Sequence, residues 1–197
     1  MTMPTIVLAS ASPRRKQLLE MLHIPVVVTP ANVQEIPLPG EAPAAYVRRL
    51  ARDKARAVPG TYVLGADTTV VLDGHILEKP VDDDDAVRML GLLQGRAHTV
   101  ITAICLVAHG REHHAIDETR VTFRACSERL LRDYVATGEP RDKAGAYGIQ
   151  GWGAALVERI DGDFFGVMGL PVRLVLKVLE EAGHEYRFGT GETRDKN

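Results

Sequence analysis

A group of basic residues stands at the predicted start of a helix close to the amino terminus. The short apolar run Ile6–Leu8 is typical of a buried strand, and Ser12 and Pro13 favour the first positions of a helix. The next three residues, Arg14–Lys16, are all cations, although the helix dipole makes acids the usual choice in a first turn. Free backbone N–H groups, the dipole and two guanidinium groups together predict a polyanion site, best matched by a phosphate chain.

A solvated basic face is the simpler explanation for such a triplet, but the helical spacing argues against it. Leu18, Leu19 and Leu22 form the apolar stripe of this helix. Arg14 and Arg15 each precede a leucine of the stripe by four residues, so both are expected on the side that faces the core. Arginines in that position should line a cleft.

Two acids and a lysine are candidates for catalytic or metal-binding roles. Asp67 lies within the strand-like segment 62–72, whose other residues are mainly apolar or small. A carboxylate there is costly unless it is paired or bound to a metal, although it could also fix a turn through its side chain. Glu35 lies in a proline-bounded loop and alone would pass for a surface residue. Lys54 lies on the apolar stripe of a predicted helix, where it either reaches solvent or has a functional role.

Three other patterns do not by themselves indicate catalysis. The acidic run Asp82–Asp85 stands at the start of a predicted helix, where acids cap the helix and complement its dipole. His113 and His114 are adjacent and therefore point in different directions, which argues against a metal pair. The glycine-rich segment 145–153 matches neither a P-loop nor a dinucleotide fingerprint. It either forms a tight turn or lets the backbone approach a ligand, with Gln150 available for recognition.

Composition and charge narrow the class of protein. The 197 residues contain 45% hydrophobic and 25% charged residues, which are ordinary values for a globular protein. A formal net charge of −2 argues against general binding of nucleic acid by a basic surface. Cys105 and Cys126 have no partner at zinc-ligand or disulfide spacing, and no apolar run reaches membrane-spanning length. We therefore expect a cytoplasmic protein that binds neither nucleic acid nor membranes.

Hydrophobic periodicity and turn residues predict the elements that must position these side chains. Strands are expected at residues 6–8, 25–29, 62–72, 75–77, 99–107, 118–124, 155–160 and 164–168. Helices are expected from residue 13 onward and at residues 42–58, 83–93, 127–135 and 169–182. The pair Asp73-Gly74 predicts a two-residue hairpin turn. The mixture indicates an α/β fold with a mixed sheet, in one domain over residues 1–189, followed by a disordered tail at 190–197.

Seven segments of the sequence, taken in chain order, match the motifs of one known family. They are Leu8–Arg15 (LASASPRR), Arg49–Ala55 (RLARDKA), Gly65–Thr68 (GADT), Glu78–Pro80 (EKP), Gly95–Val100 (GRAHTV), Lys143–Gly151 (KAGAYGIQG) and Gly169–Pro171 (GLP). Together they resemble the Maf family of nucleoside triphosphate pyrophosphatases. The resemblance implies a two-lobed Maf/ITPase-like fold, with a mixed, twisted sheet flanked by helices and a central cleft. It also implies a divalent metal (Mg²⁺ or Mn²⁺), a nucleoside triphosphate substrate cleaved to monophosphate and pyrophosphate, and a possible homodimer.

The same resemblance assigns roles to individual residues. The phosphates would be held by Ser10, Arg14, Arg15, Lys54 and Lys79. Glu35 and Asp67 would supply the catalytic carboxylates for metal and water, with Asp67 as the base. Arg14, Thr68 and Gln150 match positions tied to substrate choice. The form of segment 143–151 resembles the branch that acts on dTTP and UTP, rather than the branch that acts on 7-methyl-GTP.

Two other functions would use the same cationic cleft. A non-catalytic nucleotide-binding regulator of cell division needs only the cations, and Glu35 and Asp67 argue against it because binding an anion gains nothing from two acids. A phosphatase would remove only the terminal phosphate. The products distinguish the three functions: pyrophosphate, orthophosphate or neither. The sequence leaves open the preference between dTTP and UTP, modified pyrimidine nucleotides as substrates, and which carboxylate binds metal.

Overall fold

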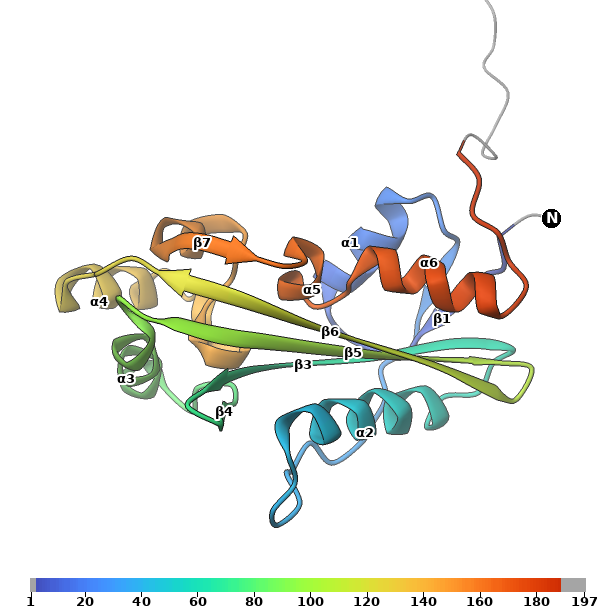
Figure 1. Cartoon of the computed structure of the whole chain (residues 1–197), viewed down its shortest axis with the longest axis horizontal. Coiled ribbons are helices and arrows are strands. Elements are labelled where there is room, and N and C mark those ends of the chain that lie inside the picture. Colours follow the sequence, from blue (N-terminus) through green and yellow to red (C-terminus); the bar gives the residue numbers. More distant parts are fainter. Residues whose placement is uncertain (1–2, 189–197) are drawn as a thin grey trace, which may run out of the picture.

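One mixed β-sheet forms the centre of the fold (Figure 1). A computed structural model of the chain describes residues 3–188. Its strands are β1 (Ile6–Leu8), β2 (Val26–Val28), β3 (Tyr62–Leu72), β4 (His75–Leu77), β5 (Ala97–Ala108), β6 (Arg111–Phe123) and β7 (Val157–Asp161). The strand order is β2-β1-β3-β5-β6-β7, with β4 paired to β3. β1 runs parallel to both of its neighbours, and the other pairs are antiparallel.

Helices cover both faces of this sheet. They are α1 (Pro13–Met21), α2 (Pro43–Arg56), α3 (Asp83–Leu93), α4 (Glu128–Ala136), α5 (Phe164–Met168) and α6 (Val172–Glu181), with 3-10 turns η1 (Glu139–Asp142), η2 (Ala144–Ala146) and η3 (Gly151–Leu156). In Figure 1, α1, α5 and α6 lie on one side of the sheet and α2 lies on the other. α3 and α4 pack together near the end of the sheet that carries β4. This arrangement confirms the predicted α/β class with a mixed sheet flanked by helices.

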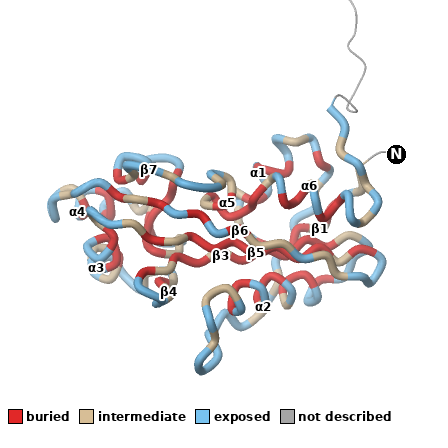
Figure 2. The backbone as a smooth tube through the Cα atoms, in the orientation of Figure 1, coloured by how far each residue is buried: buried red, intermediate tan, exposed pale blue. Residues whose placement is uncertain are grey.

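Buried residues follow β3, β5 and the inner sides of the helices (Figure 2). The two faces of β3 alternate, as the period of a strand requires. Leu64 and Ala66 belong to the apolar cluster that includes residues of α1 and α6. Gly65 instead faces α2, since a Cβ at this position would lie 2.1 Å from the carbonyl oxygen of Ala51. Asp67, two residues further along β3, lies on the face that carries Gly65.

Several local predictions are confirmed. Asp73 and Gly74 have positive φ angles of 51° and 80° and join β3 to β4, as expected for a two-residue hairpin. The side chain of Asp82 accepts a hydrogen bond from the backbone N–H of Asp85 (2.7 Å), so the acidic run does cap α3. Cys105 and Cys126 are free thiols.

Two predicted strands differ from the structure. Residues 164–168 form the short helix α5, because the Asp163 side chain caps its start at the Gly166 N–H and Gly169 ends it with a φ of 111°. Strand β6 begins at Arg111 instead of residue 118. The hairpin before it turns at His109-Gly110, both with positive φ, and a His-Gly pair is a weaker turn signal than Asn-Gly or Asp-Gly.

None of the described helices combines the length and the apolar composition needed to cross a lipid bilayer. The tail predicted at residues 190–197 lies outside the described residues. On β6, His113 Nδ1 lies 3.6 Å from Glu181 of α6, whereas His114 contacts Glu112, so the two histidines do point to different faces.

Candidate active site

A cleft of about 430 Å³ lies beside the centre of the sheet, a volume in the range of small-molecule sites. Its walls come from the β1–α1 turn, α2, β3, the end of β4, the segment 142–150 and the end of α5. It is lined by all nine residues that the sequence predicted for the site: Ser10, Arg14, Arg15, Glu35, Lys54, Asp67, Thr68, Lys79 and Gln150. Lys16, the third cation of the opening motif, is exposed and pairs with Glu20 (3.1 Å) outside the cleft.

Lys54 links the two candidate catalytic acids. Its Nζ lies 2.7 Å from Asp67 Oδ1 and 2.7 Å from Glu35 Oε1. Lys54 and Asp67 are buried, whereas the Glu35 side chain is 38% exposed at the cleft. Of the two roles left open for Lys54, the structure rejects the one in which its side chain reaches solvent.

The glycine of β3 determines how Lys54 meets Asp67. Because Gly65 has no side chain, the backbone of α2 at Ala51 and Ala55 packs directly on β3. Lys54 lies one helical turn after Ala51, and Asp67 lies two residues after Gly65 on the same face of the strand. The close approach of helix and strand therefore brings ammonium and carboxylate within hydrogen-bond distance.

The surroundings of the two acids shift their pKa values in opposite directions. Burial raises the pKa of Asp67, and Glu35 adds to this rise, while Lys54 and Arg15 oppose it. Burial also disfavours ionisation of Glu35, but Lys54, Lys79 and Arg15 outweigh it and hold the pKa of Glu35 below its ordinary value. Carboxyl groups whose pKa values are pushed apart are typical of acid–base sites. The surroundings thus make Asp67 more basic and Glu35 less basic than in a free side chain.

Arg15 joins four parts of the cleft wall. Its Nε donates to the carbonyl oxygen of Gly169 (2.8 Å), one terminal nitrogen donates to Ser10 Oγ (3.0 Å), and the other donates to Thr68 Oγ1 (3.2 Å). Thr68 in turn lies 2.9 Å from Thr102 Oγ1 on β5. The guanidinium is buried, and burial lowers the pKa of Arg15 while Asp67 and Glu35 oppose that shift. Its orientation is therefore fixed by the protein before any ligand binds.

Three predicted residues lie at the more open edge of the cleft. Arg14 is 27% exposed and contacts Asp142 (3.3 Å), and Lys79 is 59% exposed, with its Nζ 3.8 Å from Glu35 Oε2. Gln150 is exposed and follows the buried pair Gly148 and Ile149. These side chains are available to a ligand that enters the cleft.

Polar residues that line the cleft but were not predicted for the site include Tyr46, Glu78, Asp142 and Lys143. Glu78 and Lys143 lie within two of the matched motifs, so the motifs themselves could have indicated them. Tyr46 is one of the largest fully buried side chains, and nothing in its local sequence distinguishes it from a core residue.

A buried histidine supports the wall near Gln150. His98 Nε2 lies 2.8 Å from the hydroxyl of Tyr147, and both rings pack edge-on against Phe123. Burial lowers the pKa of His98 to about 4, so the imidazole is neutral at physiological pH. Tyr147 lines the cleft, and His98 therefore positions a cleft residue without reaching the cleft itself.

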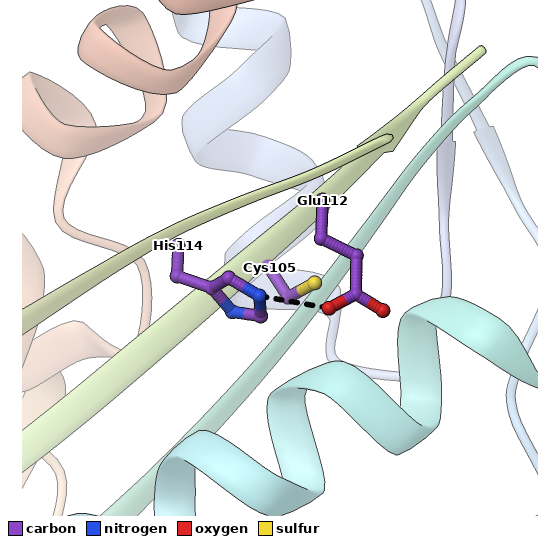
Figure 3. Close-up of side chains that lie close together, drawn as sticks. All are labelled: Cys105, Glu112 and His114. Carbon is purple, nitrogen blue, oxygen red and sulfur yellow. Dashed lines mark hydrogen bonds and ion pairs between the residues drawn. The ribbon is translucent and has the colours of Figure 1, made fainter. Parts of the chain in front are cut away.

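Figure 3 shows a second group of ligand-type side chains, Cys105, Glu112 and His114, outside the cleft. Their donor atoms lie within 4.8 Å of one another, because Cys105 on β5 pairs with His114 on β6 and Glu112 lies on the same face. Both oxygens of Glu112 are engaged: Oε1 accepts a hydrogen bond from Arg56, and Oε2 lies 2.9 Å from His114 Nε2. Burial raises the pKa of the Cys105 thiol to about 12. The group is thus satisfied internally.

Comparison with known proteins gives a consistent family assignment. A protein named dTTP/UTP pyrophosphatase from Koribacter versatilis is 49% identical over 182 residues, covering 90% of this chain and 94% of that protein. A protein of the same name from Bacillus velezensis is 47% identical over 180 residues, covering 89% and 95%. The solved structure of the Staphylococcus aureus Ham1 protein overlaps with a TM-score of 0.45 at 15% identity, over 61% of this chain and 72% of that chain. The family model described as Maf-like protein matches residues 5–182, and this chain therefore belongs to the Maf family.

Proposed function

We propose that this protein hydrolyses dTTP and UTP to the nucleoside monophosphate and pyrophosphate. The observation that carries the proposal is the convergence of the nine predicted site residues on one cleft, with Lys54 bridging Asp67 and Glu35. Relatives that are 47% to 50% identical over about nine tenths of the chain are named dTTP/UTP pyrophosphatase, which supports the same substrates here.

In the proposed reaction, a water molecule attacks the α-phosphorus of the nucleotide. Its oxygen forms a bond to that phosphorus, and the bond from the phosphorus to the bridging oxygen breaks, so that pyrophosphate leaves with the electron pair. Asp67 accepts the proton of the water, a role that suits the acid whose pKa is raised by its surroundings. A positioned base of this kind contributes about 10²–10⁴-fold to the rate.

The cations of the cleft neutralise the triphosphate and its leaving group. Arg15 and Lys54 are buried and held by several partners each, so they present fixed positive charge. Arg14 and Lys79 at the open edge would complete the contacts to the phosphates, together with the hydroxyl of Ser10. Charge that is already oriented stabilises a transition state without the cost of reorganisation.

The acidic side of the cleft fits a divalent metal cofactor. Glu35 and Asp67 share Lys54 as a partner and offer the carboxylate oxygens that Mg²⁺ and Mn²⁺ prefer. We assign these two residues to the metal, which when bound would withdraw negative charge from the phosphates. The ammonium group of Lys54, which contacts both Glu35 and Asp67, holds their carboxyl groups close together before a metal binds.

Base recognition is assigned to the edge that carries Gln150. An amide both donates and accepts hydrogen bonds, which suits the imide edge of uracil or thymine. Gly148 and Ile149 line the cleft next to Gln150, and Arg14 and Thr68 would complete the contacts that select the substrate. This end fixes the nucleotide so that the α-phosphorus lies next to Asp67.

Analysis of the products tests the proposed function. The purified protein is incubated with a panel of nucleoside triphosphates and Mg²⁺ or Mn²⁺, and pyrophosphate and orthophosphate are measured separately. Pyrophosphate from dTTP and UTP supports the proposal. Orthophosphate alone would identify a phosphatase, and binding without either product would identify the non-catalytic regulator.

The free thiols Cys105 and Cys126 support a cytoplasmic location, and light scattering tests the homodimer that the family resemblance implies.

A further inference from the structure

Glu139, the first residue of η1, binds the segment that carries Gln150, although it does not line the cleft itself. Its Oε2 accepts a hydrogen bond from the backbone N–H of Trp152 (2.9 Å), and its Oε1 accepts one from the N–H of Gly153 (3.0 Å). Oε1 also accepts a hydrogen bond from the hydroxyl of Tyr134 (2.9 Å). Hydrogen bonds to an ionised acceptor are stronger than those between neutral groups, so the three donors should hold this segment in one conformation.

Tyr134 extends the contact to the other side of Gln150. Its hydroxyl donates to Glu139 and accepts a hydrogen bond from the Gly148 N–H (3.1 Å). The hydroxyl keeps its proton, because burial raises the pKa of Tyr134 and the charge of Glu139 adds to the rise, although the bond from Gly148 opposes it. The backbone on both sides of Gln150 is thus bound to one carboxylate, directly or through one hydroxyl.

The glycines of this segment close around Glu139 and Tyr134. A Cβ at Gly151 would lie 2.5 Å from Glu139 Oε2, and the φ of 72° at this residue also favours glycine. A Cβ at Gly153 would lie 2.7 Å from the Tyr134 hydroxyl and 2.2 Å from the Gly148 carbonyl oxygen. Glycine-rich backbone that binds an anion often holds the phosphate of a ligand. At these glycines, the anion is a carboxylate of the protein itself.

Glu139 also caps the 3-10 turn η3 in place of Gln150. Gln150 occupies the N-cap position of η3, but its side chain makes no capping hydrogen bond. The N–H groups of Trp152 and Gly153 lie in the first turn of η3 and are bound by Glu139 instead. The Gln150 amide is therefore not used to satisfy the backbone, and it remains exposed at the cleft.

We propose that Glu139 is a positioning residue for recognition of the nucleotide base. It holds the backbone on both sides of Gln150 and caps η3, so that the Gln150 amide stays available to the base at a fixed place. The inference rests on the proposed function, since it concerns how the same cleft selects a pyrimidine. It adds a residue that acts on the base only through the loop.

Binding of two nucleotide analogues tests this role without relying on turnover. Titration calorimetry with the α,β-imido analogues of dTTP and dATP and Mg²⁺ is carried out on the wild type, Glu139→Gln and the control Glu128→Gln. Glutamine offers one accepting oxygen in place of two, so Glu139→Gln should lower the preference for the dTTP analogue about fivefold, the effect of one ordinary hydrogen bond to the base. Glu128→Gln changes an exposed acid of α4 that pairs with Arg132 (2.8 Å), and it should keep the wild-type preference. A wild-type preference in Glu139→Gln, or an equal loss of affinity for both analogues, overturns the proposal.

A double-mutant cycle separates action through Gln150 from a general structural effect. In a Gln150→Ala background, Glu139→Gln should change the preference between the two analogues little, because the amide that Glu139 positions is absent. A further fall of similar size in the double variant would show that Glu139 affects the site by another route, and it overturns the proposal.

Trp152 is the only tryptophan of the chain and reports on the loop directly. Its side chain is 71% exposed, and its backbone N–H is bound by Glu139. The fluorescence anisotropy of the protein without nucleotide should therefore fall in Glu139→Gln. It should also fall in Tyr134→Phe, which removes only the hydroxyl between Glu139 and Gly148, together with the preference for the dTTP analogue. Wild-type anisotropy and preference in both variants overturn the proposal, and Tyr134→Phe decides alone if Glu139→Gln does not fold.

The proposed function and the role of Glu139 fail in different ways. A wild type that releases no pyrophosphate from dTTP, but prefers the dTTP analogue in a way that depends on Glu139, contradicts only the proposed hydrolysis. A wild type that releases pyrophosphate, together with an unchanged preference in Glu139→Gln, contradicts only the positioning role. A wild type that binds both analogues equally well also overturns the positioning role.

Discussion

Lys54 of α2 and Asp67 of β3 form a buried ion pair, with 2.7 Å between Nζ and Oδ1. Their side chains are only 8% and 7% exposed. Charges this deeply buried are stable together, and removing one partner leaves the other uncompensated. The same ammonium also holds Glu35, so one lysine organises both acids of the cleft.

Asp67→Asn should reduce the kcat for dTTP by at least about a hundredfold, because it removes the proposed base and keeps the side-chain volume. Steady-state kinetics with dTTP and UTP measure the effect. Asp117→Asn is a matched control, since Asp117 is equally buried but lies outside the cleft, where it pairs with Arg173 and Thr119. The control should lose stability and retain the kcat of the folded protein. An Asp67→Asn enzyme with wild-type kcat would leave Glu35 as the leading candidate for the base.

Gly65→Ala should impair both stability and activity. Its Cβ would lie 2.1 Å from the Ala51 carbonyl oxygen, so α2 must move away from β3 and carry Lys54 with it. Overpacking of this kind costs about 1–3 kcal/mol, measured by urea unfolding, and we expect kcat to fall because Lys54 separates from Asp67. Gly91→Ala in α3 is the control, because nothing lies within 4 Å of its added methyl group and alanine favours a helix. Normal activity in Gly65→Ala would show that the spacing of α2 and β3 is not critical.

Gln150→Ala should change substrate choice more than the best rate. The variant loses the amide proposed to read the pyrimidine edge, so the ratio of kcat/KM for dTTP to that for dATP should fall. Gln17→Ala, an exposed glutamine of α1, should leave the ratio unchanged. An equal loss of activity on every nucleotide would place Gln150 in the chemical step.

His98 makes the stability of the fold depend on pH. Its pKa of about 4 in the folded protein lies below the value of about 6.5 in an unfolded chain, so the unfolded chain binds more protons between these values. Stability therefore falls as the pH drops from about 6.5 towards 4, by about 2 kcal/mol at pH 5. Urea unfolding at neutral and mildly acidic pH measures this loss.

The His98→Gln variant should lack most of that pH dependence, because glutamine does not titrate and still reaches the Tyr147 hydroxyl. His75→Gln replaces an exposed histidine and should behave like the wild type. If the unfolding curves of His98→Gln and the wild type respond equally to acid, then His98 does not carry the effect.

The sequence predicted the site best where local signals and chemistry agree. The strand, turn and basic helix start at residues 6–15 require only short-range preferences, and the structure has them as expected. Asp67 stood out because a carboxylate is rare in an apolar strand. The partner that makes its burial possible, Lys54, lies on another element, so the pairing itself required the tertiary structure.

Long-range packing explains what the sequence could not show. The local sequence around Glu78 does not show that it lies at the cleft wall, because that position depends on contacts with Gly145 and Tyr46, both far away in the chain. The helix at residues 164–168 was read as a strand because the capping effect of Asp163 and Gly169 outweighs the preference of a short apolar run. The local sequence around Glu78 is compatible with an exposed or a buried side chain, and residues 164–168 are compatible with a strand or a helix.

The position of Asp67 and Thr68 in the sheet has a kinetic consequence. β3 pairs with β5 continuously from Tyr62 to Val71, and β5 pairs in turn with β6, so the floor of the cleft is an interior strand. Amide hydrogens in such a strand exchange with solvent only when much of the protein opens. An incoming nucleotide therefore meets Asp67 and Thr68 already in place, and its binding energy is not consumed in ordering these two residues.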